Sequence, residues 1–557
     1  MAILEDLLSK GYLPVQLPPG FSSASFASAL PGYERIWEQN GEPPATLPER
    51  YSVARSSFYR RITSIVNPIG FYFLAKEIAT YWSKIEDHYS KTSLSRSIPV
   101  FGDSLRAIRL KKFSELYEEK VTSAAGFKFA LVTDISSFFP TIYTHTIPWA
   151  LHTKAIAKAK RARVPKYFGN ILDARSMSVQ DGQTIGLPIG PDTSHIIAEI
   201  IAVAIDERLR AELGGWPSGF RYVDDFFLFF DRREDAEKAL AAVTRAVSSF
   251  ELQVSAAKTR IIEVKELVEE SWKYGIRKLK IASARKPQRH DIHHYFEFMF
   301  ALEHRFKDES LIKYGLKQLS SRIVKRSNWS VFEAYLLKCG FGFPNTIQLI
   351  AHILSTYGRH GYPVNREAIG RFCNNLISTS AAADHHGEVS WLLWICKELS
   401  IRVESDPARA SERMGSPLCT LILLDMQNAG LLAERLDAVP LAQMAAPDAL
   451  LGSGWLLSYE AGRREWLGLE NDRFISEHEY FGPLNSADVA FYDDAKLLSP
   501  IFEFKEPTSQ RDDAIFDTDE EIEDSFDFDD MDEEYFDSVD SKDSESDADE
   551  VDTADEF

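Results

Sequence analysis

Hydrophobic and polar positions follow two different patterns along the chain. Between about residues 51 and 265, helical stretches such as 194–209 alternate with short apolar runs at 127–133 and 226–230, which predict strands. From 266 to about 500 the strand signals fade, and segments rich in Leu, Ala, Ile and Trp recur at helical spacing. The pattern predicts an α+β region followed by an all-helical region.

The two ends of the chain differ from both regions. Residues 1–50 contain seven prolines, so we expect a short helix followed by an irregular N-terminal arm. Residues 506–557 are dominated by Asp, Glu and Ser and are expected to form a disordered acidic tail, either a solubilising segment or a mimic of nucleic acid. The helical part, 266–505, is expected to stack its helices in pairs in a HEAT-like array, although no fixed repeat period is apparent.

Charge and composition exclude several classes of protein. The net charge is −21, but residues 511–557 hold 24 acidic and two basic residues, so the remainder, with 61 basic and 60 acidic residues, is nearly neutral and compatible with a polyanionic partner. No apolar stretch is long enough to span a membrane, and no secretory signal is present, so a cytoplasmic protein is expected. The four cysteines lack metal-site spacing, and no P-loop motif occurs.

Three aspartates are the strongest candidates for chemistry. Asp224 and Asp225 lie between aromatic and β-branched runs, which predicts a β-hairpin with both carboxylates at its turn. Asp134 ends another predicted strand, and Pro140 opens the helix that follows. An Asp-Asp pair alone is usually a solvated turn, but three acids at neighbouring strand ends suit two Mg²⁺ ions, with Mn²⁺ as an alternative, in nucleotidyl transfer.

Together these segments resemble reverse transcriptases over about residues 55–265. Tyr222-Val-Asp-Asp225 resembles the Y-x-D-D box of that family, Asp134 with Phe138-Phe139 its first palm motif, and Gly186-Leu-Pro-Ile-Gly-Pro191 its second. Segments 134–152 and 180–194 resemble most closely the bacterial defence-associated, abortive-infection reverse transcriptases, in which a C-terminal helical domain follows the palm. The resemblance implies right-hand polymerase fingers and palm over 51–265.

The resemblance also implies roles for individual residues. Asp134, Asp224 and Asp225 would hold the metal. Lys258 would act near the departing pyrophosphate, or it is an ordinary surface lysine. Phe139 would exclude the 2′-hydroxyl of ribonucleotides, or its ring only packs in the core. The other residues expected at the nucleotide are Arg60 and Arg61 of the fingers, Ile135, Gly186, Pro188 and Gly190. Ile189 departs from the Gln that template-copying relatives often carry.

Two basic stretches are candidates for binding nucleic acid, although charge runs are usually solvated surfaces. Lys154, Lys158 and Arg161 are expected on one face of a helix, and Lys278 and Lys280 lie just past the polymerase region. With the resemblance, these features imply an RNA-directed DNA polymerase that uses dNTPs and makes a DNA product. The protein is expected to be a homo-oligomer and not to bind a membrane.

Three functions remain open at this stage. By resemblance the enzyme acts in antiphage defence, with synthesis that is untemplated or primed by a protein or a non-coding RNA. The alternatives are templated cDNA synthesis of the retron or group II intron kind, and a non-catalytic nucleic-acid-binding assembly protein.

Overall fold

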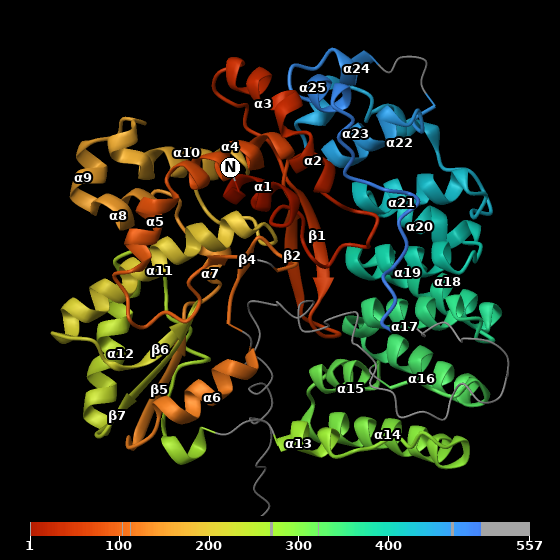
Figure 1. Ribbon diagram of the computed structural model, residues 1–557, viewed down its shortest axis with the longest axis horizontal. Helices are drawn as coiled ribbons and strands as arrows, with labels where there is room; N and C mark the ends of the chain where they lie inside the picture. Colours follow the sequence, from red (N-terminus) through yellow and green to blue (C-terminus); the bar gives the residue numbers. More distant parts are fainter. Residues whose placement is uncertain are drawn as a thin grey trace, which may run out of the picture.

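The computed structural model describes residues 2–102, 104–111, 113–267, 271–320, 322–468 and 473–502. The predicted acidic tail lies outside these residues. Two halves are visible in Figure 1, a mixed α/β half built from the first part of the chain and a column of helices built from the second. No helix among the described residues is both long and apolar enough to cross a bilayer.

A four-stranded antiparallel sheet forms the centre of the α/β half. Its strands are β5 (Phe129–Asp134), β6 (Ser218–Tyr222), β7 (Asp225–Phe230) and β8 (Arg260–Glu263), in the order β6-β7-β5-β8. The interiors of β5 and β7 are buried without alternation, because helix α12 (Arg233–Ser248) packs on both strands and Lys120 of α6 (Phe113–Ser123) lies over the Phe227 ring. The strands predicted at 127–133 and 226–230 are confirmed within two residues.

Helices pack around this sheet and position its loops. The longest is α11 (Asp192–Leu213), which matches the predicted helix at 194–209, contacts α12 and is buried along most of its first five turns. The other elements of this half are α4 (Pro68–Thr80), α5 (Trp82–Tyr89), β3 (Val100–Phe101), β4 (Ile108–Arg109), α7 (Phe138–Thr141), α8 (Thr146–His152), α9 (Lys154–Ala159) and α10 (Phe168–Ser178).

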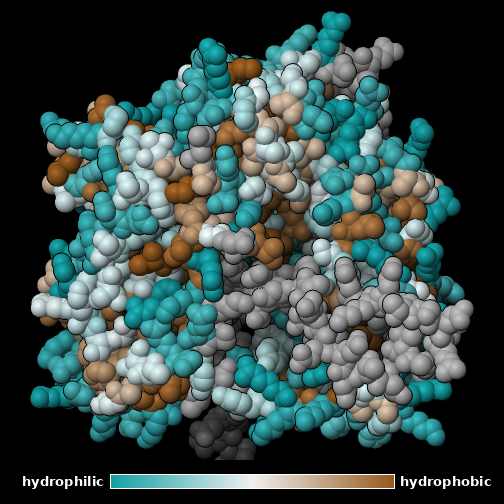
Figure 2. Space-filling view, in the orientation of Figure 1, coloured by the Kyte–Doolittle hydropathy of each residue, from teal (hydrophilic) through white to brown (hydrophobic). Residues whose placement is uncertain are grey.

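A separate β-hairpin, β1 (Glu49–Ala54) with β2 (Arg60–Ile65), stands between the two halves (Figure 1). On the side of the α/β half, the Ser64 amide donates to the carbonyl of Ile189 at 2.7 Å. On the helical side, β1 packs against α19 (His386–Glu398). In Figure 2 the rim of this face is largely hydrophilic, and hydrophobic residues gather near its middle, where the two halves meet.

The N-terminal segment begins with a short helix, α1 (Ala2–Ser9), as predicted. The arm expected to be irregular instead contains two further helices, α2 (Ala24–Ser28) and α3 (Leu30–Gln39). Pro31 lies in the first turn of α3, where the missing amide hydrogen is harmless. The buried rings of Phe26, Tyr33 and Trp37 pack together, and the Trp37 indole donates to the carbonyl of Tyr480, so this segment joins the two ends of the described chain.

The second half is a two-layer array of helices, as the apolar spacing predicts. One layer contains α14 (Arg285–Phe306), α16 (Trp329–Gly342), α18 (Arg366–Ala382) and α20 (Ser405–Met414); the other contains α15 (Ser310–Ser320), α17 (Ile347–Arg359), α19, α21 (Pro417–Asn428) and α23 (Trp455–Arg463). Each helix contacts the next in its layer, and α14, α16, α18 and α20 contact α15, α17, α19 and α21, respectively, in the other layer. The flanking helices are α13 (Ser271–Arg277), α22 (Ala438–Ala442), α24 (Arg473–Ser476) and α25 (Phe481–Ser486).

Glu49 at the start of β1 makes the contact between the halves sensitive to pH. Its buried carboxylate accepts hydrogen bonds from the Leu418 amide and the Ser416 hydroxyl, and burial raises the pKa of Glu49 to about 8. The folded state therefore binds a proton that the unfolded state releases above its own pKa, so stability falls as the pH rises from about 4.5 towards 8.

Glu49→Gln is expected to stabilise the protein, because the amide oxygen can accept both hydrogen bonds, from the Leu418 amide and the Ser416 hydroxyl, without carrying a charge. The gain should be small at pH 5 and reach up to a few kcal/mol at pH 8, at ~1.4 kcal/mol per pKa unit. Denaturant unfolding of both forms at the two pH values measures it. An equal gain at both would show that ionisation of Glu49 is not involved.

Candidate active site

The sheet brings the three predicted aspartates together. Asp134, the last residue of β5, is the register partner of Asp225, the first residue of β7. Asp224 lies in the two-residue turn between β6 and β7, and its carbonyl accepts a hydrogen bond from the Ile135 amide at 3.2 Å. The hairpin with acids at its turn, and the strand ending in an acid, are both as predicted.

These carboxylates interact unfavourably with one another. Burial, followed by the charges of Asp225 and Asp134, raises the pKa of Asp224 well above its ordinary value. Lys258 opposes this effect, since its ammonium lies 3.1 Å from Oδ2 of Asp134. The other oxygen, Oδ1 of Asp134, is buried and accepts no hydrogen bond from the described part of the chain.

This donor set suits a hard divalent cation, which takes oxygen ligands and relieves carboxylate repulsion. A bound cation would give Oδ1 of Asp134, which is buried and accepts no hydrogen bond from the described residues, a positive partner. The same charge would favour the ionised form of Asp224, whose pKa is raised. As the side chains stand, however, no group of three or more His, Cys, Asp and Glu residues in the described ranges is spaced to hold a metal ion. The Lys258 ammonium supplies the positive charge beside Asp134.

Phe139 lies on the same connection as Asp134. Ser137 between them has a left-handed φ of 47°, which turns the chain sharply into α7. The Phe139 ring is buried, lies 6.4 Å from the His195 ring and forms part of the wall of a pocket. Ile135, directly after Asp134, is fully buried and pairs with Val254, so its side chain supports the site from within the core.

The loop from Gly186 to Gly190 contributes Ile189 and Gly190 to the wall of the same pocket. Gly186 and Gly190 have φ values of +90° and +127°, which L side chains rarely adopt. A Cβ on Gly190 would lie 2.8 Å from Cγ of Pro14, so this position also requires glycine for space. Pro188 is buried within the loop, and the neighbouring Leu187 amide donates to the Phe139 carbonyl at 2.9 Å.

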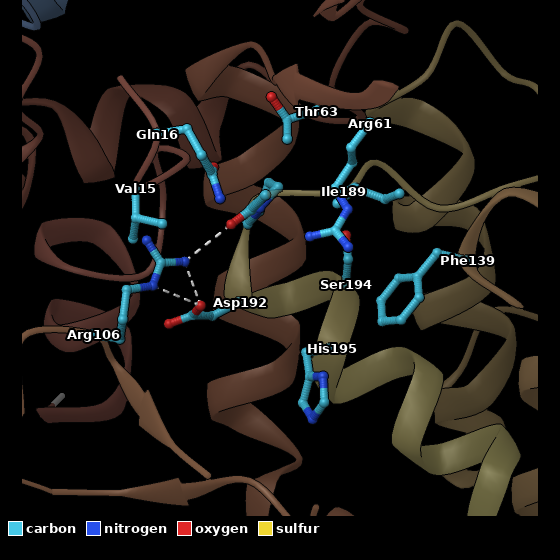
Figure 3. Close-up of a pocket in the computed structure, with 12 residues that line it drawn as sticks. Val15, Gln16, Arg61, Thr63, Arg106, Phe139, Ile189, Asp192, Ser194 and His195 are labelled. Atoms are coloured by element: carbon cyan, nitrogen blue, oxygen red, sulfur yellow. Dashed lines mark hydrogen bonds and ion pairs between the residues drawn. The ribbon is translucent and has the colours of Figure 1, made fainter. Parts of the chain in front are cut away.

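Figure 3 shows the pocket that these elements enclose. The side chains of Arg61 and Phe139 point toward the same part of it, and Ile189 lies beside them. Arg106 occupies the other side, where its guanidinium pairs with Asp192 and donates to the carbonyls of Leu13 and Gly190 at 2.7 and 2.9 Å.

Arg60 and Arg61 have different surroundings, although the sequence does not distinguish them. Arg60 forms a bidentate ion pair with Glu388 of α19, with one bond at 2.7 Å, and also donates to the Ser52 hydroxyl. Arg61 lines the pocket with Phe139 and Ile189. Of the two, Arg61 is therefore placed toward the candidate site and Arg60 toward the helical half.

A comparison with protein families fits this geometry. Residues 75–285 match the model of the family described as reverse transcriptase (RNA-dependent DNA polymerase). The chain contains a reverse transcriptase domain. No curated protein matches the chain.

The reverse transcriptase domain is that of an RNA-directed DNA polymerase, a nucleotidyltransferase. A domain of this kind implies nucleotide substrates and nucleic acid as template or product. Such enzymes generally use divalent metal ions, and this agrees with the donor chemistry of the three acids. The matched residues include all three aspartates, Phe139, the glycine loop and Lys258.

The basic residues predicted to bind nucleic acid lie in two separate places. Lys154 and Lys158 are on α9, but Arg161 follows the end of that helix, so the three do not share one helical face. The helix stops at Ala159, before a run of exposed residues that includes Arg161. Lys278 and Lys280 are exposed just past α13. In Figure 1, α9 lies at the upper left and α13 at the bottom of the molecule.

Sequence reasoning missed the polar residues that support the site from behind. Arg106 and Asp192 meet although 86 positions separate them. Arg221 of β6 is completely buried between two acids of α11. The charge inside the strand at 218–222 was the available signal for Arg221, since a buried charge needs partners. Nothing comparable marks Arg106.

Proposed function

We propose that Asp134, Asp224 and Asp225 hold the divalent cations of a DNA-synthesising active site in this domain. The observation that carries the proposal is the sheet register that pairs Asp134 with Asp225, next to the turn that carries Asp224. When bound there, Mg²⁺ or Mn²⁺ supplies positive charge for the attacking 3′-oxygen and the departing pyrophosphate. The raised pKa of Asp224 supports the proposal, because bound cations would favour its ionised form.

The chain's own residues would act on the nucleotide from three sides. Lys258, held beside Asp134, is suited to donate a proton or a fixed charge to the pyrophosphate. Arg61 extends from the fingers hairpin toward the pocket and is suited to bind the triphosphate. Phe139 would close the pocket on the 2′ side of the sugar, while the backbone of Gly186, Pro188 and Gly190 approaches the nucleotide and Ile135 supports the floor.

The cellular role proposed is antiphage defence of the abortive-infection kind. Support comes from the resemblance of segments 134–152 and 180–194 to that class, and from the helical half that follows the reverse transcriptase domain. Ile189, in place of the Gln of template-copying relatives, favours untemplated synthesis or priming by a protein or non-coding RNA. A cytoplasmic homo-oligomer belongs to the same proposal.

The deciding experiment incubates the purified protein with Mg²⁺ and each labelled dNTP, and then treats the product with protease or nuclease. A protease-sensitive product of biased composition supports protein-primed, untemplated synthesis. A product whose sequence matches a copurified RNA instead indicates templated synthesis of the retron or intron kind. Absence of incorporation with every dNTP, with and without added primer and template, would leave a nucleic-acid-binding assembly protein.

Binding of nucleic acid through the α9 region would show in its salt dependence. Replacing Lys158 or Arg161, both exposed, by Gln should reduce the slope of log affinity against log salt concentration by about one each. Lys154→Gln should reduce it less, because its ammonium already lies 3.0 Å from Glu251 and over the Trp149 ring. Fluorescence anisotropy with a labelled oligonucleotide at several salt concentrations measures the slope.

The control is Lys496→Gln, which removes an exposed charge from the C-terminal segment of the described chain. Its slope should equal that of the unaltered protein. Unchanged slopes for Lys158→Gln and Arg161→Gln would place the nucleic acid elsewhere. Lys278→Gln and Lys280→Gln then test the other basic stretch.

A further inference from the structure

A buried charge cluster lies directly behind the turn that carries the acids. Arg221, on β6, is fully buried and donates to Asp206 at 2.9 and 2.8 Å and to Glu199 at 3.1 and 2.8 Å. Both acids belong to α11 and are seven residues apart, so they present carboxylates on one face of the helix. The cluster therefore ties strand β6 to α11 at the position that precedes the Y-x-D-D box.

The same arginine also binds the turn itself. Its Nη1 donates to the carbonyl of Val223 at 2.7 Å. The Val223 amide donates to the Ser97 hydroxyl at 2.8 Å, and that hydroxyl donates in turn to Glu199 at 3.1 Å. Both backbone polar groups of Val223 are thus held by the cluster.

Val223 needs such support because of its backbone conformation. Its φ is 52°, in the left-handed region, which a β-branched residue adopts only at a cost. It occupies the first central position of the two-residue turn, where hairpins with φ > 0 usually carry glycine. Without the two hydrogen bonds, the turn would be expected to relax and move the carboxylates of Asp224 and Asp225.

Neighbouring residues hold the cluster in place with further hydrogen bonds. The hydroxyl of Thr92 donates to Asp206 at 2.8 Å, and that of Ser95 donates to Glu199 at 2.6 Å. Two backbone hydrogen bonds, from the Arg221 amide to the Leu94 carbonyl and from the Arg96 amide to the Arg221 carbonyl, fix β6 beside this segment. Burying one cation with two acids is expensive, and replacing such a group by apolar residues is often neutral or stabilising. A role in stability alone does not account for it, whereas fixing the geometry of the adjacent turn does.

We propose that Arg221 is a positioning residue that holds Val223 in its left-handed conformation and thereby sets Asp224 and Asp225 opposite Asp134. The proposal rests on the proposed function of these acids, but not on the nature of the template or primer. It predicts that the need for Arg221 disappears when residue 223 adopts the left-handed conformation freely.

The test is a double-mutant cycle with Val223→Gly. The first variant, Arg221→Met with Glu199→Gln and Asp206→Asn, removes all three charges together and leaves none unpaired. A milder variant, Ser97→Ala, removes the acceptor for the Val223 amide and one donor to Glu199, keeps all three charges, and keeps the protein testable if the first variant fails to fold. Arg359→Met with Glu398→Gln, which removes an ion pair between α17 and α19, is the control.

Two quantities are measured for each variant with and without Val223→Gly. They are kcat and KM for dNTP incorporation, and the rise in unfolding temperature on titration with Mg²⁺ alone. The charge-free variant should lose about tenfold to a hundredfold in kcat with little change in KM, because displaced catalytic groups affect the reacting geometry. It should also need more Mg²⁺ for half of the thermal shift, and Ser97→Ala should show smaller changes in the same direction.

Val223→Gly should restore most of both losses while barely changing the unaltered protein. If Val223→Gly has the same proportional effect in every background, Arg221 does not act through the turn and the proposal is wrong. If the unaltered protein neither incorporates nucleotides nor shows a Mg²⁺ shift, the proposed function itself fails. The control variant, Arg359→Met with Glu398→Gln, should lower stability. Val223→Gly should not raise its kcat.

Discussion

Replacing Asp225 by Asn is expected to lower nucleotide incorporation about a thousandfold, which corresponds to ~4 kcal/mol at ~1.4 kcal/mol per decade. The substitution removes one of the paired carboxylates of β5 and β7 while keeping the size and hydrogen-bonding shape of the side chain. Cation-assisted phosphoryl chemistry depends on that charge, so kcat should carry the loss. Asp224→Asn and Asp134→Asn should have comparable effects.

The control for this series is Asp231→Asn, which removes an exposed acid just beyond the far end of β7. It should incorporate nucleotides at the normal rate. Unfolding temperatures should be normal for all variants, and Asp224→Asn should not destabilise the protein, since it removes a repelling charge from a buried site. Normal incorporation by Asp225→Asn would show that the paired acids are not the reacting centre.

The elements that carry these acids were predictable because the residue types within each short segment are enough to indicate a strand or a hairpin. The aromatic and β-branched runs around Asp224 predict a hairpin, and an apolar run ending in Asp134 predicts a strand. Predicting that the three aspartates lie together required knowing that β5 lies beside β7. Only the order of the segments that resemble reverse transcriptases indicated this. The sheet register then places Asp134 opposite Asp225.

The parts that were not predictable depend on contacts between distant segments. Proline density indicated an irregular N-terminus, but aromatic packing against the end of the described chain makes 24–39 helical. Adjacent arginines of β2 alternate in direction, and only the position of α19 shows that Arg60 pairs with Glu388. The apparent helical face that includes Arg161 fails because α9 ends at Ala159.

The hairpin β1–β2 links the polymerase site to the helical half through neighbouring residues. Ser64 binds the carbonyl of Ile189 in the glycine loop, and Arg60 on the same strand binds Glu388. Since Arg61 lies between them in the sequence and lines the pocket, the helical half helps to determine where the Arg61 side chain lies. The second half of the chain is therefore part of the support for the site.

Phe139→Ala is expected to relax discrimination against ribonucleotides by about tenfold to a hundredfold, while incorporation of dNTPs falls much less. The buried ring forms part of the pocket wall beside Ile189 and is fixed by the Leu187–Phe139 backbone hydrogen bond and by its contact with His195. Removing it opens the space that a 2′-hydroxyl would occupy. The measurement is the ratio of kcat/KM for a dNTP to that for the matching rNTP.

Phe138→Ala provides the matched control for the loss of an aromatic ring. Phe138 is buried, and its ring lies edge-on to that of Phe139 at 5.7 Å, but it does not line the pocket. Its removal should lower stability by a similar amount, about 3–5 kcal/mol, and leave the sugar preference unchanged. Equal relaxation by both variants would mean that general loosening of α7 is responsible, and unchanged discrimination in Phe139→Ala would assign the gate to another residue.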